Sequence, residues 1–218
     1  MRIENLRTGS TENGARVVAT VSWEDCERPT QDIYFETVDE FTQALVPNPD
    51  AFLTACIIPA MRHGEERIIV DGEICAELRH GLITAMSWIR HWYGSERKLV
   101  RIEAETRRSV LTPQKPERAG VFFSGGVDSF ASLRMNRLDF LLEHPSSFKD
   151  GILIFGNEVR SWEAFEYVVN QLSIAAEASD IKLIPVSTNV SSLDYDQGFW
   201  TDEFQGAVLS SGCARACA

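Results

Sequence analysis

The sequence predicts an α/β protein in which a parallel-sheet domain follows a small α+β domain. The second half alternates short apolar runs with helical patterns, in the order strand, helix, strand, helix, strand. The first half combines several strand-like stretches with one long amphipathic helical pattern. Between the halves, residues 109–118 hold two prolines and mostly polar side chains, which is typical of a linker. We therefore expect domains over residues 1–108 and 119–218.

The first half begins with a predicted β-hairpin. Residues 15–23 are rich in β-branched side chains and follow an Asn-Gly turn signal, so we expect a strand that pairs with residues 3–7. The other elements expected before residue 71 are strands over 33–36 and 67–70 and a short helix over 37–46. The apolar residues 51–60 fit a strand or a helix by periodicity.

The clearest helix of the first half is predicted over residues 73–93 and should end at Gly94. Its apolar side chains form one stripe: Ile74, Leu78, Leu82, Ile83, Met86, Ile89 and Trp92. Alternating apolar and charged residues over 99–105 then predict a strand with one wet face. Nothing in this half has metal-ligand spacing, and its scattered histidines, including His63, are better explained by packing than by catalysis.

After residue 118 the pattern predicts buried strands over 120–123, 151–155 and 181–186 and helices over 130–143 and 163–178. The first helix is amphipathic, with four apolar residues on one face: Ala131, Met135, Leu138 and Leu142. Right-handed crossovers through these helices give a parallel sheet. Ligands of such sheets bind beyond the carboxyl ends of the strands.

The strongest functional signal is the string SGGVDS at residues 124–129, between the first of these strands and its helix. Two glycines permit a tight turn and close approach of a ligand. Free backbone amides and the helix dipole favour a polyphosphate. A carboxylate beside such an anion site is costly unless a divalent metal lies between them. A glycine turn that only joins strand to helix is the alternative interpretation.

The SGGVDS string resembles the SGGxDS signature of the PP-loop ATP pyrophosphatases, a superfamily that includes GMP, NAD and asparagine synthetases and 7-cyano-7-deazaguanine synthase. It is not a Walker A loop, because no Gly-Lys-Ser/Thr follows. The resemblance implies a PP-loop domain, of the adenine nucleotide alpha hydrolase-like fold, over residues 119–218. Members of this superfamily split ATP between the α and β phosphates and usually adenylate a carbonyl oxygen. We therefore expect an amide- or nitrile-forming ligase, nearest to 7-cyano-7-deazaguanine synthase.

The resemblance also implies roles for individual residues. The loop amides would hold pyrophosphate, the two serine hydroxyls would bind phosphate oxygens, and Asp128 would help to hold Mg²⁺. The expected catalytic residues are Ser124, Asp128 and Ser129. The expected ATP-binding residues are Ser124, Gly125, Gly126, Val127, Asp128, Ser129, Phe155 and Gly156, the last two on the adenine side. The expected cofactors are ATP and Mg²⁺, and the expected partner is a small-molecule substrate.

The C-terminal end departs from the superfamily pattern. A PP-loop domain normally has more parallel strands than the three supplied here, and the last residues are small and unlike the expected helix and strand. We therefore expect a truncated or frameshifted product, or an expressed fragment. Cys213 and Cys217 could share one helical face, but a structural zinc needs four ligands.

Several alternatives stay open. The acidic residues after the third strand could assist a metal or a substrate amine, or form a solvated loop: Asp194, Asp196, Asp202 and Glu203. A sulfur-transferring PP-loop enzyme would need a cysteine from the C-terminal tail. A nucleotide-binding or assembly module without turnover is also compatible, because an incomplete sheet leaves an unpaired strand edge.

The composition excludes several classes of protein. Apolar residues make up 44% of the chain, enough for a core, and the net charge of −11 argues against bulk nucleic-acid binding. Five scattered cysteines fit reduced thiols and a cytoplasmic location better than a disulfide framework. No apolar segment resembles a signal peptide or a membrane span. A homo-oligomer is compatible with these features.

Overall fold

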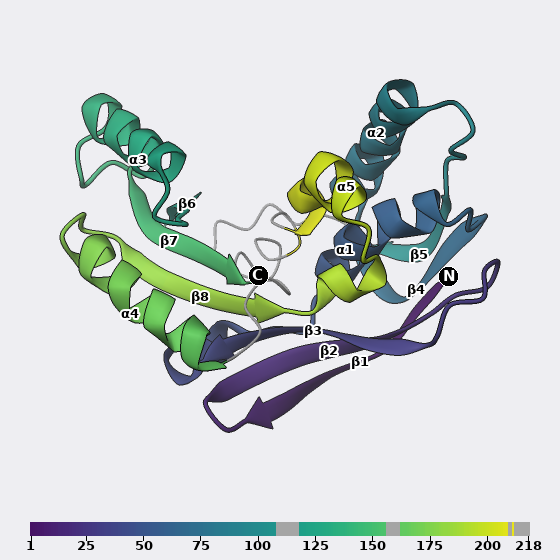
Figure 1. Cartoon of the computed structure of the whole chain (residues 1–218), viewed down its shortest axis with the longest axis horizontal. Coiled ribbons are helices and arrows are strands. Elements are labelled where there is room, and N and C mark those ends of the chain that lie inside the picture. Colours follow the sequence, from purple (N-terminus) through teal and green to yellow (C-terminus); the bar gives the residue numbers. More distant parts are fainter. Residues whose placement is uncertain (108–117, 156–161, 209–210, 212–218) are drawn as a thin grey trace. The chain divides into compact units, whose positions relative to one another are not determined.

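The computed structural model describes residues 1–107, 118–155, 162–208 and 211 (Figure 1). The chain forms two compact units. Unit 1 comprises Met1–Val110 and Thr188–Ala218, and unit 2 comprises Leu111–Ser187. Unit 2 is therefore inserted into unit 1, whereas the sequence predicted a second domain that continues to residue 218. Most of the predicted linker lies outside the described residues.

Unit 1 is built on a mixed sheet with the strand order β5-β4-β1-β2-β3. Its strands are β1 (Arg2–Thr11), β2 (Gly14–Ser22), β3 (Gln31–Val38), β4 (Arg67–Cys75) and β5 (Arg101–Arg107). β1 and β2 form the predicted antiparallel hairpin, with Ile3 opposite Val21. β3 continues it antiparallel, whereas β4 runs parallel to both β1 and β5. Instead of ending at residue 70, β4 passes through the predicted turn with a register shift between Ile69 and Glu73.

The core of unit 1 is the helix α1 (Pro49–Arg62), which settles the ambiguous apolar stretch as helical. Asn48 caps it by accepting a hydrogen bond from the Asp50 amide at 3.1 Å, and proline fits the first helical position. Every residue from Asp50 to Met61 is buried. Ahead of α1, the predicted helix over 37–46 is only the 3₁₀ turn η1 (Asp39–Ala44), because β3 extends to Val38.

Helix α2 (Ala76–Tyr93) confirms the predicted long helix and ends before Gly94. Its apolar stripe is less buried than the pattern suggests. Within the helix only Leu82 and Met86 are buried, whereas Ile83 is 42% exposed and Trp92 is 64% exposed. The Trp92 ring stacks instead on Trp88, with a centroid separation of 5.6 Å.

The chain returns to unit 1 through residues 188–208, which we call the return segment. It contains η2 (Val190–Leu193), α5 (Gln197–Phe199) and the π-helical turn η3 (Trp200–Phe204). Thr188 Oγ1 donates to the Tyr34 carbonyl at 2.6 Å, and Asn189 Oδ1 accepts from the Tyr34 amide at 2.9 Å. These bonds fix the segment to β3.

Unit 2 is a small α/β unit with the parallel strand order β8-β7-β6. Its elements are β6 (Ala119–Phe122), α3 (Val127–Asp139), β7 (Phe148–Phe155), α4 (Trp162–Glu177) and β8 (Lys182–Thr188). This succession confirms the predicted alternation of strands and helices. The buried core cluster consists of Phe123, Leu133, Ala176 and Ile181.

The polar side chains at the end of α3 tie unit 2 together. Asn136 Nδ2 donates to the Ser146 carbonyl, and Asn136 Oδ1 accepts from the Phe148 amide. The Arg137 guanidinium donates to the Phe148 carbonyl at 2.9 Å and to the Ser179 carbonyl at 3.2 Å. Arg137 therefore links α3, the start of β7 and the turn after α4.

The predicted apolar face of α3 is largely exposed. The buried residues of the helix are Ser129, Leu133 and Asn136. α3 ends at Asp139, before the predicted residue 143. We call the exposed apolar residues Met135 and Leu138 of α3, together with Leu142 beyond its end, the α3 stripe; they are 57%, 60% and 40% exposed. The face of α3 that packs on the core of unit 2 therefore contains fewer apolar residues than the four that the sequence predicts. Among the described helices, none has the length and apolar character that crossing a membrane requires.

Candidate functional site

The SGGVDS loop lies at the carboxyl end of β6 and leads directly into α3, as the sequence predicts. Phe122 is in register with Ile152 of β7, and the Phe123 amide donates to the Ile152 carbonyl at 2.9 Å. The Phe123 side chain is fully buried and packs edge-on against Phe130 of α3. Residues on both sides of the loop are therefore anchored, which holds the loop at the end of the parallel strands where ligands of such sheets bind.

Gly125 gives the loop its tight turn. Its φ angle is +74°, in the left-handed region that favours glycine. A Cβ at this position would lie 2.4 Å from Cδ2 of Leu172 in α4. Any side chain here would therefore strain the backbone, and the Leu172 side chain would have to move, so the turn favours glycine.

Gly126 is the N-cap residue of α3 and supplies no side-chain hydrogen bond to the first helical turn. Most helices cap these amides with a serine, threonine or acidic side chain. Amides that lack such a cap are available to an external anion, which the positive end of the helix dipole also attracts. The arrangement can therefore hold a phosphate group by its backbone.

The polar side chains of the loop differ in exposure. Ser124 and Asp128 are exposed, and Val127 beside Asp128 is 86% exposed. Ser129 is 6% exposed, and its hydroxyl donates to the Gly126 carbonyl at 2.8 Å. In this structure Ser129 therefore braces the loop, and its predicted contact with a phosphate oxygen stays a prediction.

The predicted adenine-side residues are only partly described. Phe155 ends β7, is half-buried and packs edge-on against Phe165 of α4, with a centroid separation of 4.6 Å. Gly156 lies outside the described residues. A role for either residue beside adenine stays a prediction.

The residues present fit a magnesium ion held jointly with a nucleotide. Among the described residues, no three His, Cys, Asp or Glu side chains gather as a metal site. Mg²⁺ usually keeps several waters and takes one or two carboxylates together with substrate phosphates. The exposed Asp128 in the first turn of α3 can be such a carboxylate, and the phosphates of a bound nucleotide would complete the site.

Three of the four acidic residues after the third strand are bound to cations of unit 1, whereas the fourth, Asp202, is exposed and accepts a hydrogen bond from the Tyr93 hydroxyl through its backbone carbonyl. Asp194 Oδ2 lies 3.0 Å from Arg62 Nε and 2.8 Å from His63 Nε2. Asp196 pairs with Arg62 at 2.8 Å, and Glu203 pairs with Arg97. These three carboxylates therefore hold the return segment in place instead of forming a free metal site or a solvated loop.

His63 is held between charges of both signs. Its Nε2 lies 3.1 Å from Arg28 Nη1 as well as 2.8 Å from Asp194, and the Trp23 ring packs edge-on against it. Burial lowers the pKa of His63, and the hydrogen bond that the Asp194 carboxylate accepts opposes that shift only in part. Local sequence patterns could not indicate this cluster, because His63 and Asp194 are 131 positions apart.

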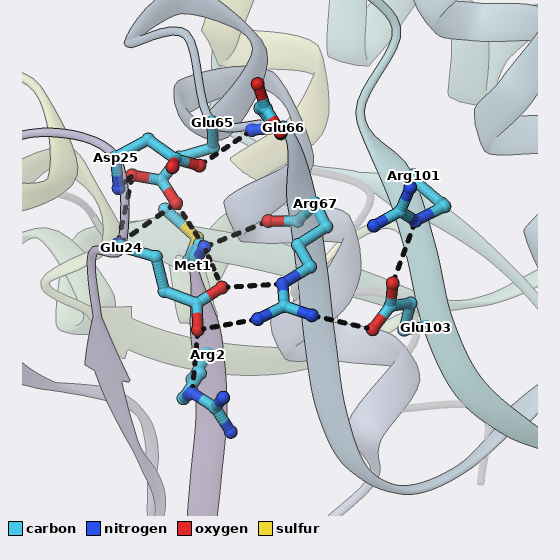
Figure 2. Close-up of polar contacts among 9 residues, drawn as sticks. All are labelled: Met1, Arg2, Glu24, Asp25, Glu65, Glu66, Arg67, Arg101 and Glu103. Carbon is cyan, nitrogen blue, oxygen red and sulfur yellow. Dashed lines mark hydrogen bonds and ion pairs between the residues drawn. The ribbon is translucent and has the colours of Figure 1, made fainter.

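A second polar cluster surrounds Glu65, which is 1% exposed (Figure 2). Its carboxylate accepts the Met1 ammonium group and the backbone amides of Glu24 and Asp25. Arg67 bridges Glu24 and Glu103 beside it. Each buried charge here is compensated, so the cluster is structural.

No protein-family model matches the chain, and no curated protein or solved structure matches it. A functional proposal therefore depends on the residues themselves. Of the features described above, the glycine loop of unit 2 has the geometry of a ligand site. The charged clusters of unit 1 are largely satisfied internally.

Proposed function

We propose that unit 2 binds Mg-ATP on residues 124–129 and that the protein is an ATP-dependent synthase of the PP-loop type. The observation that carries the proposal is the left-handed Gly125 followed by an uncapped helix N-terminus at the carboxyl end of a parallel strand. In this geometry several backbone N–H groups point toward one position, and such converging donors can bind a polyphosphate. The superfamily that the SGGVDS string resembles uses its loop for the same purpose.

The proposed reaction joins ATP to a small-molecule substrate. A carbonyl oxygen of the substrate attacks the α-phosphorus of ATP, the bond to the β-phosphate oxygen breaks, and pyrophosphate leaves. The loop amides and the N-terminus of α3 stabilise the charge that develops on pyrophosphate. Asp128 would hold Mg²⁺, which when bound neutralises phosphate charge. A nitrogen nucleophile then attacks the adenylated carbon, the bond from that carbon to the AMP oxygen breaks, AMP leaves, and the nitrogen loses a proton to solvent, as in carbon–nitrogen ligases.

Calorimetry of Mg-ATP binding tests the proposal directly. We expect saturable binding by the parent chain and binding at least about tenfold weaker in Asp128→Ala, because a carboxylate that shares the metal contributes on the order of 1.4 kcal/mol or more. The matched control is Asp139→Ala, which removes an exposed carboxylate from the opposite end of α3. Absence of binding by the parent at millimolar ATP, or equal affinities of the two variants, would contradict the proposal.

Gly125→Ala provides an independent test of the loop. The added Cβ would strain a left-handed backbone and clash with Leu172, so we expect loss of ATP binding. Gly81→Ala is its control, since Gly81 lies in α2 of unit 1 and a Cβ there would meet nothing within 4 Å. Retained affinity in Gly125→Ala would mean that the turn is not the nucleotide site.

The second candidate is a nucleotide-binding or assembly module without turnover. The exposed α3 stripe favours it, because contiguous exposed apolar side chains often mark an interface. The described part of β6 also has a strand partner on one side only, β7. Pyrophosphate release separates the two candidates: an enzyme releases it from ATP in the presence of substrate, whereas a module binds ATP without releasing it.

A further inference from the structure

A cavity of about 330 Å³ lies in unit 1, whereas the proposed ATP site belongs to unit 2. It is lined by the end of α1 and by the turn that follows α2: Met61, Arg62, Gly64, Glu96, Arg97 and Lys98. Three of these side chains are cationic and one is acidic. Cationic side chains around a small cavity can bind an anion where neighbouring carboxylates do not use all of their donors.

The two arginines are held in fixed positions by carboxylates of the return segment. Arg62 uses Nε toward Asp194 and Nη2 toward Asp196, and its guanidinium lies 4.3 Å from the Phe199 ring centroid. Arg97 pairs with Glu203 through both of its terminal nitrogens. Guanidinium groups that are already ordered lose little entropy when they bind a ligand.

Donors remain free on all three cations. None of the described hydrogen bonds and ion pairs uses Arg62 Nη1, Arg97 Nε or the Lys98 ammonium group. Burial lowers the pKa of Arg97, and the positive charge of Arg62 lowers it further. The two guanidinium groups therefore repel each other, and the carboxylates of the return segment offset part of that repulsion. An anion would bind to the donors that these carboxylates leave unused.

We propose that this cavity binds an oxyanion, the phosphate or carboxylate group of a small molecule, through Arg62, Arg97 and Lys98. Phosphates and carboxylates match the planar fork of arginine and the point charge of lysine. Glu96 lines the same cavity and weakens the binding by repulsion. The site does not depend on the proposed ATP site, because every residue involved belongs to unit 1.

Backbone amide NMR shifts during titration with inorganic phosphate, at ionic strength held constant with sodium chloride, test this site. We expect saturable shifts at residues 62–64 and 96–98 in the parent chain, and binding about tenfold weaker in Lys98→Met, which loses one charged contact. Lys182→Met is the control, because it removes a lysine that lies in unit 2. A parallel titration with sodium acetate distinguishes a phosphate site from a general carboxylate site.

Glu96→Gln should act in the opposite direction and strengthen phosphate binding severalfold, since it removes the repulsive charge and keeps the shape of the side chain. Phosphate shifts confined to residues 124–129 would support the ATP site and overturn the cavity proposal. Shifts at residues 62–64 and 96–98 with the same affinity in the parent, Lys98→Met and Glu96→Gln would also overturn it. The two proposals can therefore fail separately.

Discussion

The two units differ in where their apolar side chains lie. Unit 1 surrounds an entire helix, α1, in which every residue from Asp50 to Met61 is buried. The core cluster described in unit 2 has four buried members, while its helix α3 exposes Met135 and Leu138. Because burial of apolar surface is the dominant stabilising term, unit 1 should be the more stable of the two.

Unit 2 compensates with hydrogen bonds from charged and amide side chains, chiefly those of Asn136 and Arg137. Such bonds contribute less than a well-filled core, so unit 2 should open locally more often than unit 1. The proposed nucleotide loop is thus part of the less stable unit. Ligand-binding segments are commonly drawn from such regions, because binding there can itself supply order.

The largest expected effect is in the core of unit 1. Phe52 is fully buried and contacts the Phe35 ring at a centroid distance of 5.4 Å. We expect Phe52→Ala to lower the free energy of unfolding by about 3–5 kcal/mol, through lost transfer energy and the cavity left behind. Urea unfolding measures the loss of free energy. The control variant is Ile174→Ala in α4, where the side chain is 66% exposed. Equal losses in the two variants would mean that Phe52 does not contribute a packed core contact to unit 1.

The next effect tests the polar link of unit 2. Arg137→Met keeps an apolar stem but leaves the carbonyls of Phe148 and Ser179 without their donor. We expect a local loss of about 2–3 kcal/mol, the range for hydrogen bonds to a charged group. Hydrogen exchange should become faster at the β7 and β8 amides and stay unchanged in β1 and β2. Arg134→Met, at an exposed position of the same helix, should leave both regions unchanged.

A smaller, pH-dependent effect should come from His63 in unit 1. The pKa of His63 lies below its ordinary value of 6.5, because burial disfavours the imidazolium more than Asp194 favours it, and Arg28 and Arg62 add repulsion. The unfolded chain therefore binds the proton more readily than the folded protein. The resulting stability is fully present above pH 6.5 and is lost as the pH falls toward the lowered pKa.

Urea unfolding of the parent and His63→Gln at several pH values measures this contribution. We expect the free energy of unfolding of the parent to fall relative to that of His63→Gln as the pH is lowered from 6.5. A difference that stays constant over this range would mean that His63 has the same pKa in the folded and unfolded states.

Local patterns predicted much of the secondary structure. The β1–β2 hairpin, the helix α2 and the alternation of strands and helices in unit 2 all follow from period and turn residues. The position of the glycine loop between β6 and α3 was also predictable, because a motif of six consecutive residues carries it. These features depend on contacts close in sequence.

Features that depend on distant contacts were not predictable. The apolar run 51–60 is buried on all sides, so periodicity could not assign it to a helix. The return of the chain to unit 1 depends on pairs such as Arg62 with Asp194 and Arg97 with Glu203, whose members are far apart in the sequence. The exposed face of α3 was missed because an apolar stripe shows that a helix is amphipathic, not which residues cover it.

The smallest expected effect on folding, and the sharpest test of the difference between the units, is at Leu138. Its side chain is 60% exposed, so Leu138→Asn should change the free energy of unfolding by no more than about 0.5 kcal/mol if the stripe is open to water. A second copy of the chain on the α3 stripe would bury it, and the same substitution would then weaken self-association. Sedimentation velocity over a range of protein concentrations separates these outcomes. Unchanged sedimentation together with unchanged stability would remove the structural support for an assembly module and leave the ATP-dependent synthase as the better account of unit 2.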